Sequence, residues 1–205
     1  MFNLIEPLWS VNISRSLFAW MQASTFLSHW MPILADVFVL TYPVFLVILY
    51  VYGMITKKLQ YKISAVFIFF GTLLSAIVNL LIQYFIIEAR PNVVLGLPDL
   101  KHETIFHKFL PSSSFPSDHA AVSMGIAFSS IVWGVKNKDK KYIRFGIILI
   151  LFSLITSFSR LTTGVHWITD VIGGSIVGII VPWILMNKKI YRLIDSFGRW
   201  IGRYI

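Results

Sequence analysis

Long, continuously apolar segments dominate this chain. Five of them have about the length, near 20 residues, that a helix needs to cross a bilayer. Each is apolar throughout rather than alternating, which favours spanning helices over the strands of a membrane barrel. The pattern predicts an all-α integral membrane protein of one domain, residues 1–205, with a transmembrane core at 31–187. The five predicted spans are residues 31–55, 63–87, 118–135, 145–164 and 168–187.

The two ends of the chain have a different pattern. Residues 1–30 mix aromatic and aliphatic side chains with Glu6, Arg15 and His29. This mixture favours an amphipathic helix in the outer interface, with Trp9, Trp20 and Trp30 at the level of the headgroups. A sixth span is the alternative, and it would move the N-terminus to the inside. Residues 188–205 are predicted to form a basic interfacial tail on the cytoplasmic side.

Composition agrees with a membrane protein. Of the 205 residues, 57% are hydrophobic and 13% are charged, about half the charged fraction of an average soluble domain, which is roughly 25%. The chain has no cysteine, which excludes disulfides, thiolate catalysis and cysteine-bound metals. The net charge of +9 fits topology and anionic lipid better than nucleic acid, because loop Lys and Arg orient membrane proteins.

Basic residues fall in alternate loops, and basic loops remain in the cytoplasm. The segment 88–116 and the short link near 165–167 are therefore expected to face outward. With five spans, the N-terminus lies outside and the C-terminus inside. The basic positions are Lys57, Lys58 and Lys62 after the first span, Lys136, Lys138, Lys140, Lys141 and Arg144 after the third, and Lys188, Lys189, Arg192, Arg199 and Arg203 after the fifth.

Ionisable residues between the last two spans form a candidate reactive group. Ionisable side chains at membrane depth are costly and usually functional. Arg160 offers a forked cation suited to phosphate oxygens, and His166 can act as a nucleophile. Asp170 follows four residues later, so on a helix it shares a face with His166 and could hold the ring. The combination points to phosphoryl transfer, with a structural Arg–Asp pair as the alternative.

Further polar motifs fall at the same predicted membrane face. Arg90-Pro91 follows the second span, and Pro116-Ser117-Asp118-His119 opens the third. Loop charge and motif position are independent observations, and both put the reactive residues at the outer ends of helices.

These motifs, together with Ser159-Arg160, His166 and Asp170, resemble the three-part signature of the type 2 phosphatidic acid phosphatase family. Its members are integral-membrane lipid phosphatases whose core is similar to that of vanadium haloperoxidases. The resemblance implies that His166 forms a phosphohistidine, Asp170 holds its ring, and His119 protonates the leaving oxygen and then activates water. It also implies phosphate binding by Arg90, Arg160 and Ser117, although Ser117 could be only a helix cap. No metal or cofactor is expected, since the arginines supply the cationic field.

The chain departs from the general family pattern at two positions. Gln83 stands where members often carry a Lys, and its amide could give the phosphate a neutral donor. Asp118 replaces a Gly of the second motif. Together with Glu88, these departures resemble the bacitracin-resistance type of undecaprenyl-pyrophosphate phosphatase. Glu88 and Asp118 are auxiliary candidates: Glu88 is expected to pair with Arg90 or another cation, and Asp118 to favour the helix N-terminus.

The resemblance implies hydrolysis of undecaprenyl pyrophosphate to undecaprenyl phosphate and inorganic phosphate, which would recycle the carrier lipid for cell-wall synthesis. The site would face outward from a bacterial cytoplasmic membrane. Phosphatidic acid, phosphatidylglycerol phosphate and lipid A are alternative substrates. A transporter is disfavoured because the motif residues lie at one face, and a haloperoxidase because it would normally be soluble. The oligomeric state is left open.

The remaining polar residues receive structural interpretations. His29 is expected at the interface, and Asp36 as a buried hydrogen-bond partner or a residue near the outer interface. His102 and His107 are interpreted as solvated or lid residues of the outer loop. Close helix packing is expected at Gly173, Gly174 and Gly178.

Overall fold

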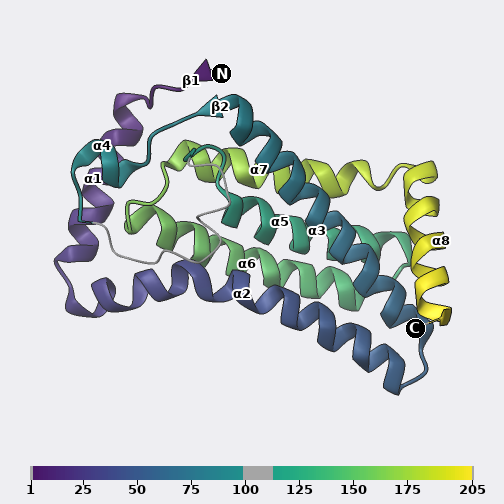
Figure 1. Ribbon diagram of the computed structural model, residues 1–205. Coiled ribbons are helices and arrows are strands. Elements are labelled where there is room, and N and C mark those ends of the chain that lie inside the picture. Colours follow the sequence, from purple (N-terminus) through teal and green to yellow (C-terminus); the bar gives the residue numbers. More distant parts are fainter. Residues whose placement is uncertain (1, 99–112, 205) are drawn as a thin grey trace.

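The computed structural model describes residues 2–98 and 113–204, which are predominantly helical. Most of the helices lie side by side, and others lie across the two ends of this bundle (Figure 1). In chain order the elements are β1 (Phe2–Asn3), α1 (Leu8–Gln22), α2 (Thr25–Ile55), α3 (Leu59–Phe85), β2 (Ile86–Ile87), α4 (Pro91–Leu95), α5 (Asp118–Lys136), α6 (Lys140–Thr162), α7 (Ile168–Ile184) and α8 (Lys188–Tyr204).

Helices α2, α3 and α6 are long and apolar enough to cross a membrane, with 31, 27 and 23 residues. Helices α7 and α8 would add a fourth span if taken together, but they are bent by 84°. The predicted class, an all-α multi-pass membrane protein, is therefore confirmed. Helices α5 and α7 run alongside the three long ones (Figure 1), and a total of five spans stays a prediction.

The first span begins six residues earlier than predicted. Ser24 has extended backbone angles and its side chain accepts a hydrogen bond from Leu27 N at 3.4 Å, which is an N-cap contact. Helix α2 therefore takes in residues 25–30, and only α1 is a separate N-terminal helix. Its predicted position in the membrane interface is not tested by the structure, although Trp9, Trp20 and Trp30 are all exposed.

Helix α5 is the central element and packs against α3, α6 and α7. Small residues allow this close approach: Ala120, Ala121, Ser123 and Gly125 are all buried. On the α7 side, a Cβ added to Gly178 would lie 2.6 Å from the Ala121 carbonyl oxygen. The expectation of close helix packing is therefore confirmed at Gly174 and Gly178, whereas Gly173 lies against Phe115 and Pro116, which precede α5.

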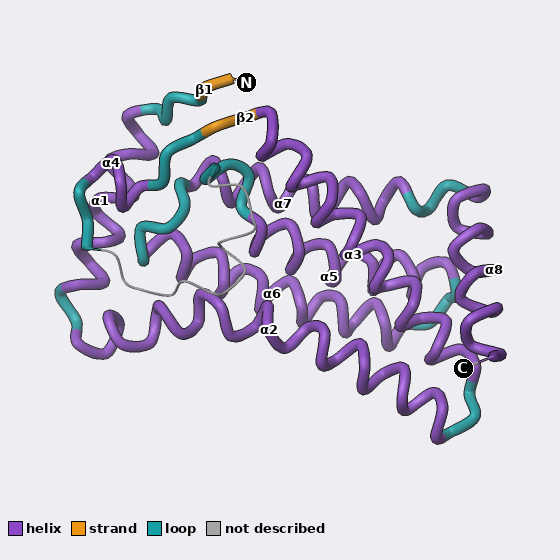
Figure 2. The backbone as a smooth tube through the Cα atoms, viewed as in Figure 1, coloured by secondary structure: helices purple, strands orange, loops and turns teal. Residues whose placement is uncertain are grey.

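The N-terminal segment pairs with the start of the segment that follows α3. Strands β1 and β2 pair in parallel, Phe2 with Ile86 and Asn3 with Ile87, and Leu4 N donates to Ile87 O at 3.0 Å. Figure 2 shows this short ladder beside the end of α3. Two-residue strands carry no period in the sequence, so the pairing was not predicted. It holds residues 2–6 close to the motif residues.

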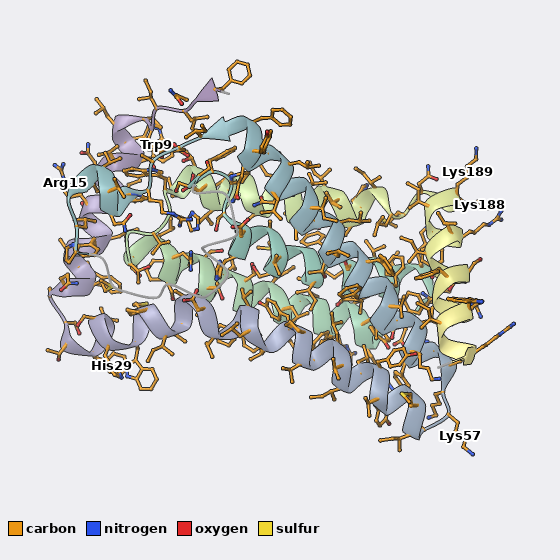
Figure 3. All side chains as sticks on the ribbon, in the orientation of Figure 1. Trp9, Arg15, His29, Lys57, Lys188 and Lys189 are labelled. Carbon is orange, nitrogen blue, oxygen red and sulfur yellow. The ribbon has the colours of Figure 1, made fainter. Side chains whose placement is uncertain are left out.

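Several lysine side chains lie at the end of the bundle that is farther from the β1–β2 pair. Figure 3 shows Lys57, Lys188 and Lys189 at that end, whereas Trp9 and Arg15 lie at the other. Helix α8 crosses the bundle there and packs against α3. Lys62 Nζ donates to the Gly202 carbonyl oxygen at 2.7 Å and fastens the helix.

Candidate active site

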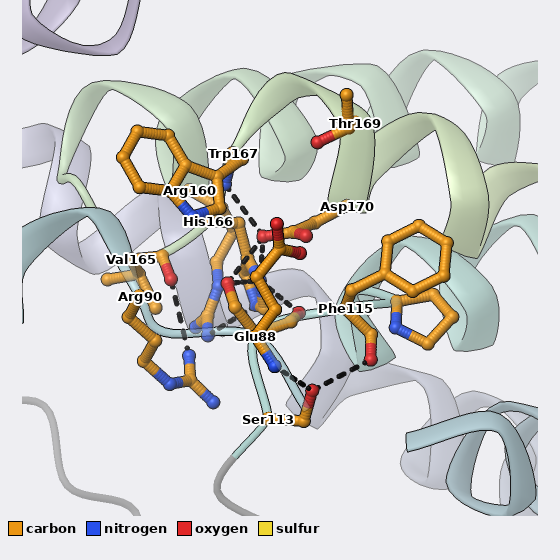
Figure 4. Close-up of polar contacts among 12 residues, drawn as sticks. Glu88, Arg90, Ser113, Phe115, Arg160, Val165, His166, Trp167, Thr169 and Asp170 are labelled. Carbon is orange, nitrogen blue, oxygen red and sulfur yellow. Dashed lines mark hydrogen bonds and ion pairs between the residues drawn. The ribbon is translucent and has the colours of Figure 1, made fainter. Parts of the chain in front are cut away.

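The three sequence motifs converge at the end of the bundle away from these lysines. Arg90 follows β2, His119 lies in the first turn of α5, and Arg160 in the last turn of α6. His166 lies in the link between α6 and α7, and Asp170 in the first turn of α7. Figure 4 shows Arg90, Arg160, His166 and Asp170 gathered around this link.

The two ring nitrogens of His166 have different surroundings: Nδ1 is held by hydrogen-bond acceptors, and Nε2 faces Arg160. Its Nδ1 lies 3.0 Å from the Ser114 carbonyl oxygen and 3.3 Å from Asp170 Oδ2. Both neighbours are acceptors, so the ring proton belongs on Nδ1 and the lone pair on Nε2. Burial lowers the pKa of His166 to about 3, against the opposing effect of the Asp170 hydrogen bond. The imidazole is therefore neutral near pH 7 and its Nε2 is nucleophilic.

The link that carries His166 is tied down locally. Gly164 has a left-handed φ of 69°, which glycine adopts without steric cost. Its carbonyl accepts from Asn92 N at 2.9 Å, and the Val165 carbonyl accepts from Arg90 Nη1 at 3.3 Å. Helix α4 and the His166 link are therefore held together.

Asp170 is completely buried. Its Oδ2 accepts hydrogen bonds from Trp167 N at 2.7 Å and from Ser114 Oγ at 2.5 Å. A carboxylate that receives several donors is stabilised in its charged form. The contact expected between His166 and Asp170 is present, and the structure adds Ser114 as a partner of both residues.

Arg160 lies between two histidines and is almost completely buried. Its Nη2 is 3.3 Å from His166 Nε2, and its Nη1 is 3.4 Å from His119 Nε2. One guanidinium therefore faces the reactive nitrogen of His166 and reaches His119. A phosphoryl group bound to it would lie beside both rings.

Asp36 is a hydrogen-bond partner, as one of the two expectations had it, but its place in this site was not predicted. It accepts from Arg160 Nη1 at 2.7 Å and lies 2.8 Å from His119 Nε2. A signal existed, because Asp36 is the one charged residue in the apolar run 31–55 and such residues are rarely idle. The site thus contains a second His–Asp pair, on α5 and α2.

Ser117 and Arg90 complete the polar lining. Ser117 occupies the N-cap position of α5 but its side chain makes no capping bond. Its hydroxyl is buried without a hydrogen-bond partner among the described residues, so a role only as a cap does not hold. Arg90 forms no ion pair within residues 2–98 and 113–204. Burial lowers its pKa, against the opposing effects of Asp118 and Asp170.

Gln83 has partners other than the expected phosphate, and one of them is Asp118, which lies in the first turn of α5 as expected. Gln83 Nε2 donates to the Pro116 carbonyl oxygen at 2.8 Å and to Asp118 Oδ1 at 3.0 Å. Asn79 Nδ2 contacts the same two acceptors, at 3.1 and 2.7 Å. The amide hydrogens expected for phosphate are used inside the protein, and they hold the start of α5 in place.

Among the described residues Glu88 does not pair with a cation, contrary to expectation. It is buried and appears in no ion pair of the described residues. Its carboxyl group instead lies within hydrogen-bonding range of those of Asp170 and Glu6. His102 and His107 lie outside the described residues. No cluster of three or more His, Asp or Glu suited to a metal ion occurs in the described part of the chain.

Comparison with known proteins decides the family. Residues 64–193 match the PAP2 superfamily, and this stretch contains Arg90, His119, Arg160, His166 and Asp170. The chain belongs to the PAP2 superfamily. It is a phosphatase of that family, and the predicted resemblance is confirmed.

Three curated proteins are similar to this chain. A protein of Escherichia coli (strain K12) with the provisional name undecaprenyl-diphosphatase YbjG is 27% identical over 202 residues, 92% of this chain and 91% of that one. The lipid A 1-diphosphate synthase of E. coli is 31% identical over 62% of this chain and 54% of its own. The undecaprenyl-diphosphatase BcrC of Bacillus subtilis (strain 168) is 31% identical over 54% of this chain and 50% of its own. No solved structure matches the chain significantly.

Proposed function

We propose that the chain hydrolyses undecaprenyl pyrophosphate to undecaprenyl phosphate and inorganic phosphate at the outer face of a bacterial cytoplasmic membrane. The observation that carries the proposal is the Arg160 guanidinium between His166 Nε2 and His119. The YbjG relative, similar over 92% of the chain, and BcrC both bear the name of this activity and support the substrate class.

In the first step the terminal phosphate binds to Arg160, Arg90 and the Ser117 hydroxyl. His166 Nε2 attacks phosphorus, and the bond to the bridging oxygen breaks. His119 gives a proton to that oxygen, so undecaprenyl phosphate leaves and a phosphohistidine remains. The fixed Nδ1–H of His166 keeps the lone pair aimed outward, while Asp170 stabilises the positive ring that forms.

In the second step His119 takes a proton from water, and the resulting nucleophile attacks the phosphohistidine. Inorganic phosphate is released and His166 recovers its lone pair. Asp36 holds His119 through the 2.8 Å contact to Nε2. Two arginines near the phosphorus neutralise the charge of each transition state, the function that cations serve in phosphoryl transfer generally.

Recycling of the carrier lipid requires the site to face outward. The support is the charge distribution: Lys57, Lys188 and Lys189 lie at the end of the bundle away from the motif residues (Figure 3). Basic ends stay in the cytoplasm. The same gathering of reactive groups at one end disfavours a transport path through the bundle.

A second substrate class is another lipid phosphate, favoured by the 31% identity to lipid A 1-diphosphate synthase. The deciding experiment measures phosphate release by the purified protein in detergent with EDTA present. The panel contains undecaprenyl pyrophosphate, phosphatidic acid, phosphatidylglycerol phosphate and lipid A. We expect the highest kcat/KM with undecaprenyl pyrophosphate. A higher value with another lipid would reassign the substrate, and no release from any lipid would contradict the proposal.

A further inference from the structure

Three carboxyl groups meet behind His166. Glu88 and Asp170 are buried, with 3% and 0% of their surfaces exposed, and Figure 4 shows the two carboxyl groups next to each other. Glu6 approaches from the N-terminal segment, where the Thr169 hydroxyl donates to it at 2.8 Å. Three like charges in one dry space would repel strongly.

The hydrogen bonds identify which carboxyl group is charged. Asp170 Oδ2 already accepts from Trp167 N, Ser114 Oγ and His166 Nδ1. Asp170 Oδ1 is buried and lacks a donor among the described groups, as do both oxygens of Glu88. Two acceptors within hydrogen-bonding range of each other can bond only if one carries a proton. Since Asp170 collects the donors, the proton belongs to Glu88.

We infer that Glu88 is a neutral carboxylic acid whose O–H donates to Asp170, which makes Glu88 a positioning residue for the His166–Asp170 pair. The inference rests on the proposed function in one respect, the role of His166 as the nucleophile. Such a donor fills the last open oxygen of Asp170. It adds no positive charge that would compete with the imidazolium formed during turnover.

The surroundings of Glu88 support the neutral form. Burial raises the pKa of Glu88 to about 10, and the carboxyl groups of Asp170 on α7 and Glu6 on the N-terminal segment act in the same direction. Two cations lie near the pair: Arg160 on α6 is directed to His166 and Asp36, and Arg90, which follows β2, donates to the Val165 carbonyl oxygen. A buried carboxylic acid among carboxylates is expected to keep its proton near pH 7.

The backbone of Glu88 is fixed by the same segment that holds the catalytic pair. Glu88 N donates to Ser113 Oγ at 3.2 Å, and Ser114 N donates to Glu88 O at 2.9 Å. Ser114 in turn contacts both His166 and Asp170. A change at Glu88 therefore reaches His166 through Asp170 rather than through the substrate.

The test compares Glu88→Gln, which keeps a neutral donor, with Glu88→Leu, which keeps volume without one. We expect Glu88→Gln to retain kcat within about threefold and Glu88→Leu to lose about tenfold or more, the usual cost of an unmet buried acceptor. KM should hardly change, because no substrate contact is lost. Ile87→Gln, which puts the same amide at the exposed neighbouring position, should behave like wild type. Equal activity of the Gln and Leu variants, at whatever level, would overturn the inference.

A second readout does not depend on turnover. Infrared spectra of wild type minus Glu88→Gln at neutral pH should contain the carbonyl stretch of a protonated carboxylic acid, and a carboxylate band in its place would overturn the assignment. A double-mutant cycle with Asp170→Asn tests the route: the Glu88→Leu loss should shrink in that background. If Glu88→Leu lowers kcat as much in the Asp170→Asn background as in the wild-type background, Glu88 does not act through Asp170. Failure of the proposed function would instead appear as no phosphate release by wild type, with the infrared result unaffected.

Discussion

Each of the two histidines in the site has one nitrogen in contact with a carboxylate. His166 contacts Asp170 through Nδ1, and His119 contacts Asp36 through Nε2. The Arg160 guanidinium reaches both rings. A nucleophile and an acid must approach phosphorus from different sides, because displacement proceeds in line. In the proposed mechanism, His166 and His119 take these two positions at a phosphoryl group bound to Arg160.

The first prediction separates the two histidines. His166→Ala should have no detectable turnover, because the nucleophile is gone. His119→Ala should still phosphorylate itself with an activated aryl phosphate, because a good leaving group needs little protonation. Trapped phosphate should map to His166, be acid-labile and survive mild base. Robust activity of His166→Ala, or phosphate found on Ser or Asp, would contradict the assignment.

The second prediction concerns Asp36. Asp36→Asn should lower kcat on the lipid substrate by about tenfold or more, because His119 loses the partner that holds it as acid and base. The loss should be smaller with an aryl phosphate, in which the leaving group needs no acid. Asp195→Asn, which breaks an exposed pair with Arg199, serves as the control and should leave kcat unchanged. An equal loss with both substrates would show that Asp36 is only structural.

The third prediction uses the pKa of Glu88, raised to about 10. The folded protein keeps a proton that the unfolded chain loses above about pH 4.3. Stability should therefore fall as pH rises from there through the folded value. Glu88→Gln does not titrate, so its Tm advantage over wild type should grow by about 10 °C or more between about pH 5 and pH 9. A constant Tm difference across this range would show that Glu88 is already ionised.

At this scale the sequence led to most of the site. Arg90, His119, Arg160, His166 and Asp170 stand in motifs of fixed spacing. Asp36 belongs to no motif, so spacing indicated nothing about its role. The only signal was the free-energy cost of a charged side chain within an apolar run. The N-terminal approach of Glu6 depends on a strand pairing without a local pattern. The acceptors of the Gln83 amide, Pro116 O and Asp118 Oδ1, lie more than 30 residues away in the chain and meet it only in the folded protein.

At the level of elements, α5 and α7 determine the geometry of the site. His119 and Asp170 lie in the first turns of these helices, and Ser117 N donates to the Asp170 carbonyl oxygen at 3.0 Å between them. Apolar runs predicted the helices well because burial in lipid requires them. Their ends differed by several residues, since caps such as Ser24 rather than hydropathy decide where a helix starts.

The fourth prediction tests the contact between α5 and α7. A Cβ at Gly178 would lie 2.6 Å from the Ala121 carbonyl oxygen and 2.8 Å from Gly125 N. These are backbone atoms, so Gly178→Ala must push the helices apart at a cost of about 1–3 kcal/mol. We expect a lower Tm and a lower kcat together. At Gly198 an added Cβ would lie 3.2 Å from the Ile63 methyl and 3.6 Å from a Val66 methyl, so Gly198→Ala should change both much less. The reverse order would contradict the packing argument.

At the level of the whole molecule, the two ends of the bundle differ in chemistry. One carries the reactive polar residues, and the other carries basic loops and α8. The sequence predicted this division because loop charge and motif position can both be read along the chain. The crossing of α8 over the bundle could not be predicted, since it depends on contacts such as that of Lys62 with Gly202.

The last prediction tests which end faces outward. The chain has no cysteine, so single replacements report position without background. Val93 is 72% exposed on α4 near the site, and Lys138 is exposed in the α5–α6 link. A membrane-impermeant thiol reagent should label Val93→Cys in intact cells. It should label Lys138→Cys only after permeabilisation, because basic links stay in the cytoplasm. Both variants should keep phosphatase activity, which shows that the labelled protein is folded. The opposite labelling pattern would place the site in the cytoplasm. The chain could then not act on a carrier lipid released at the outer face.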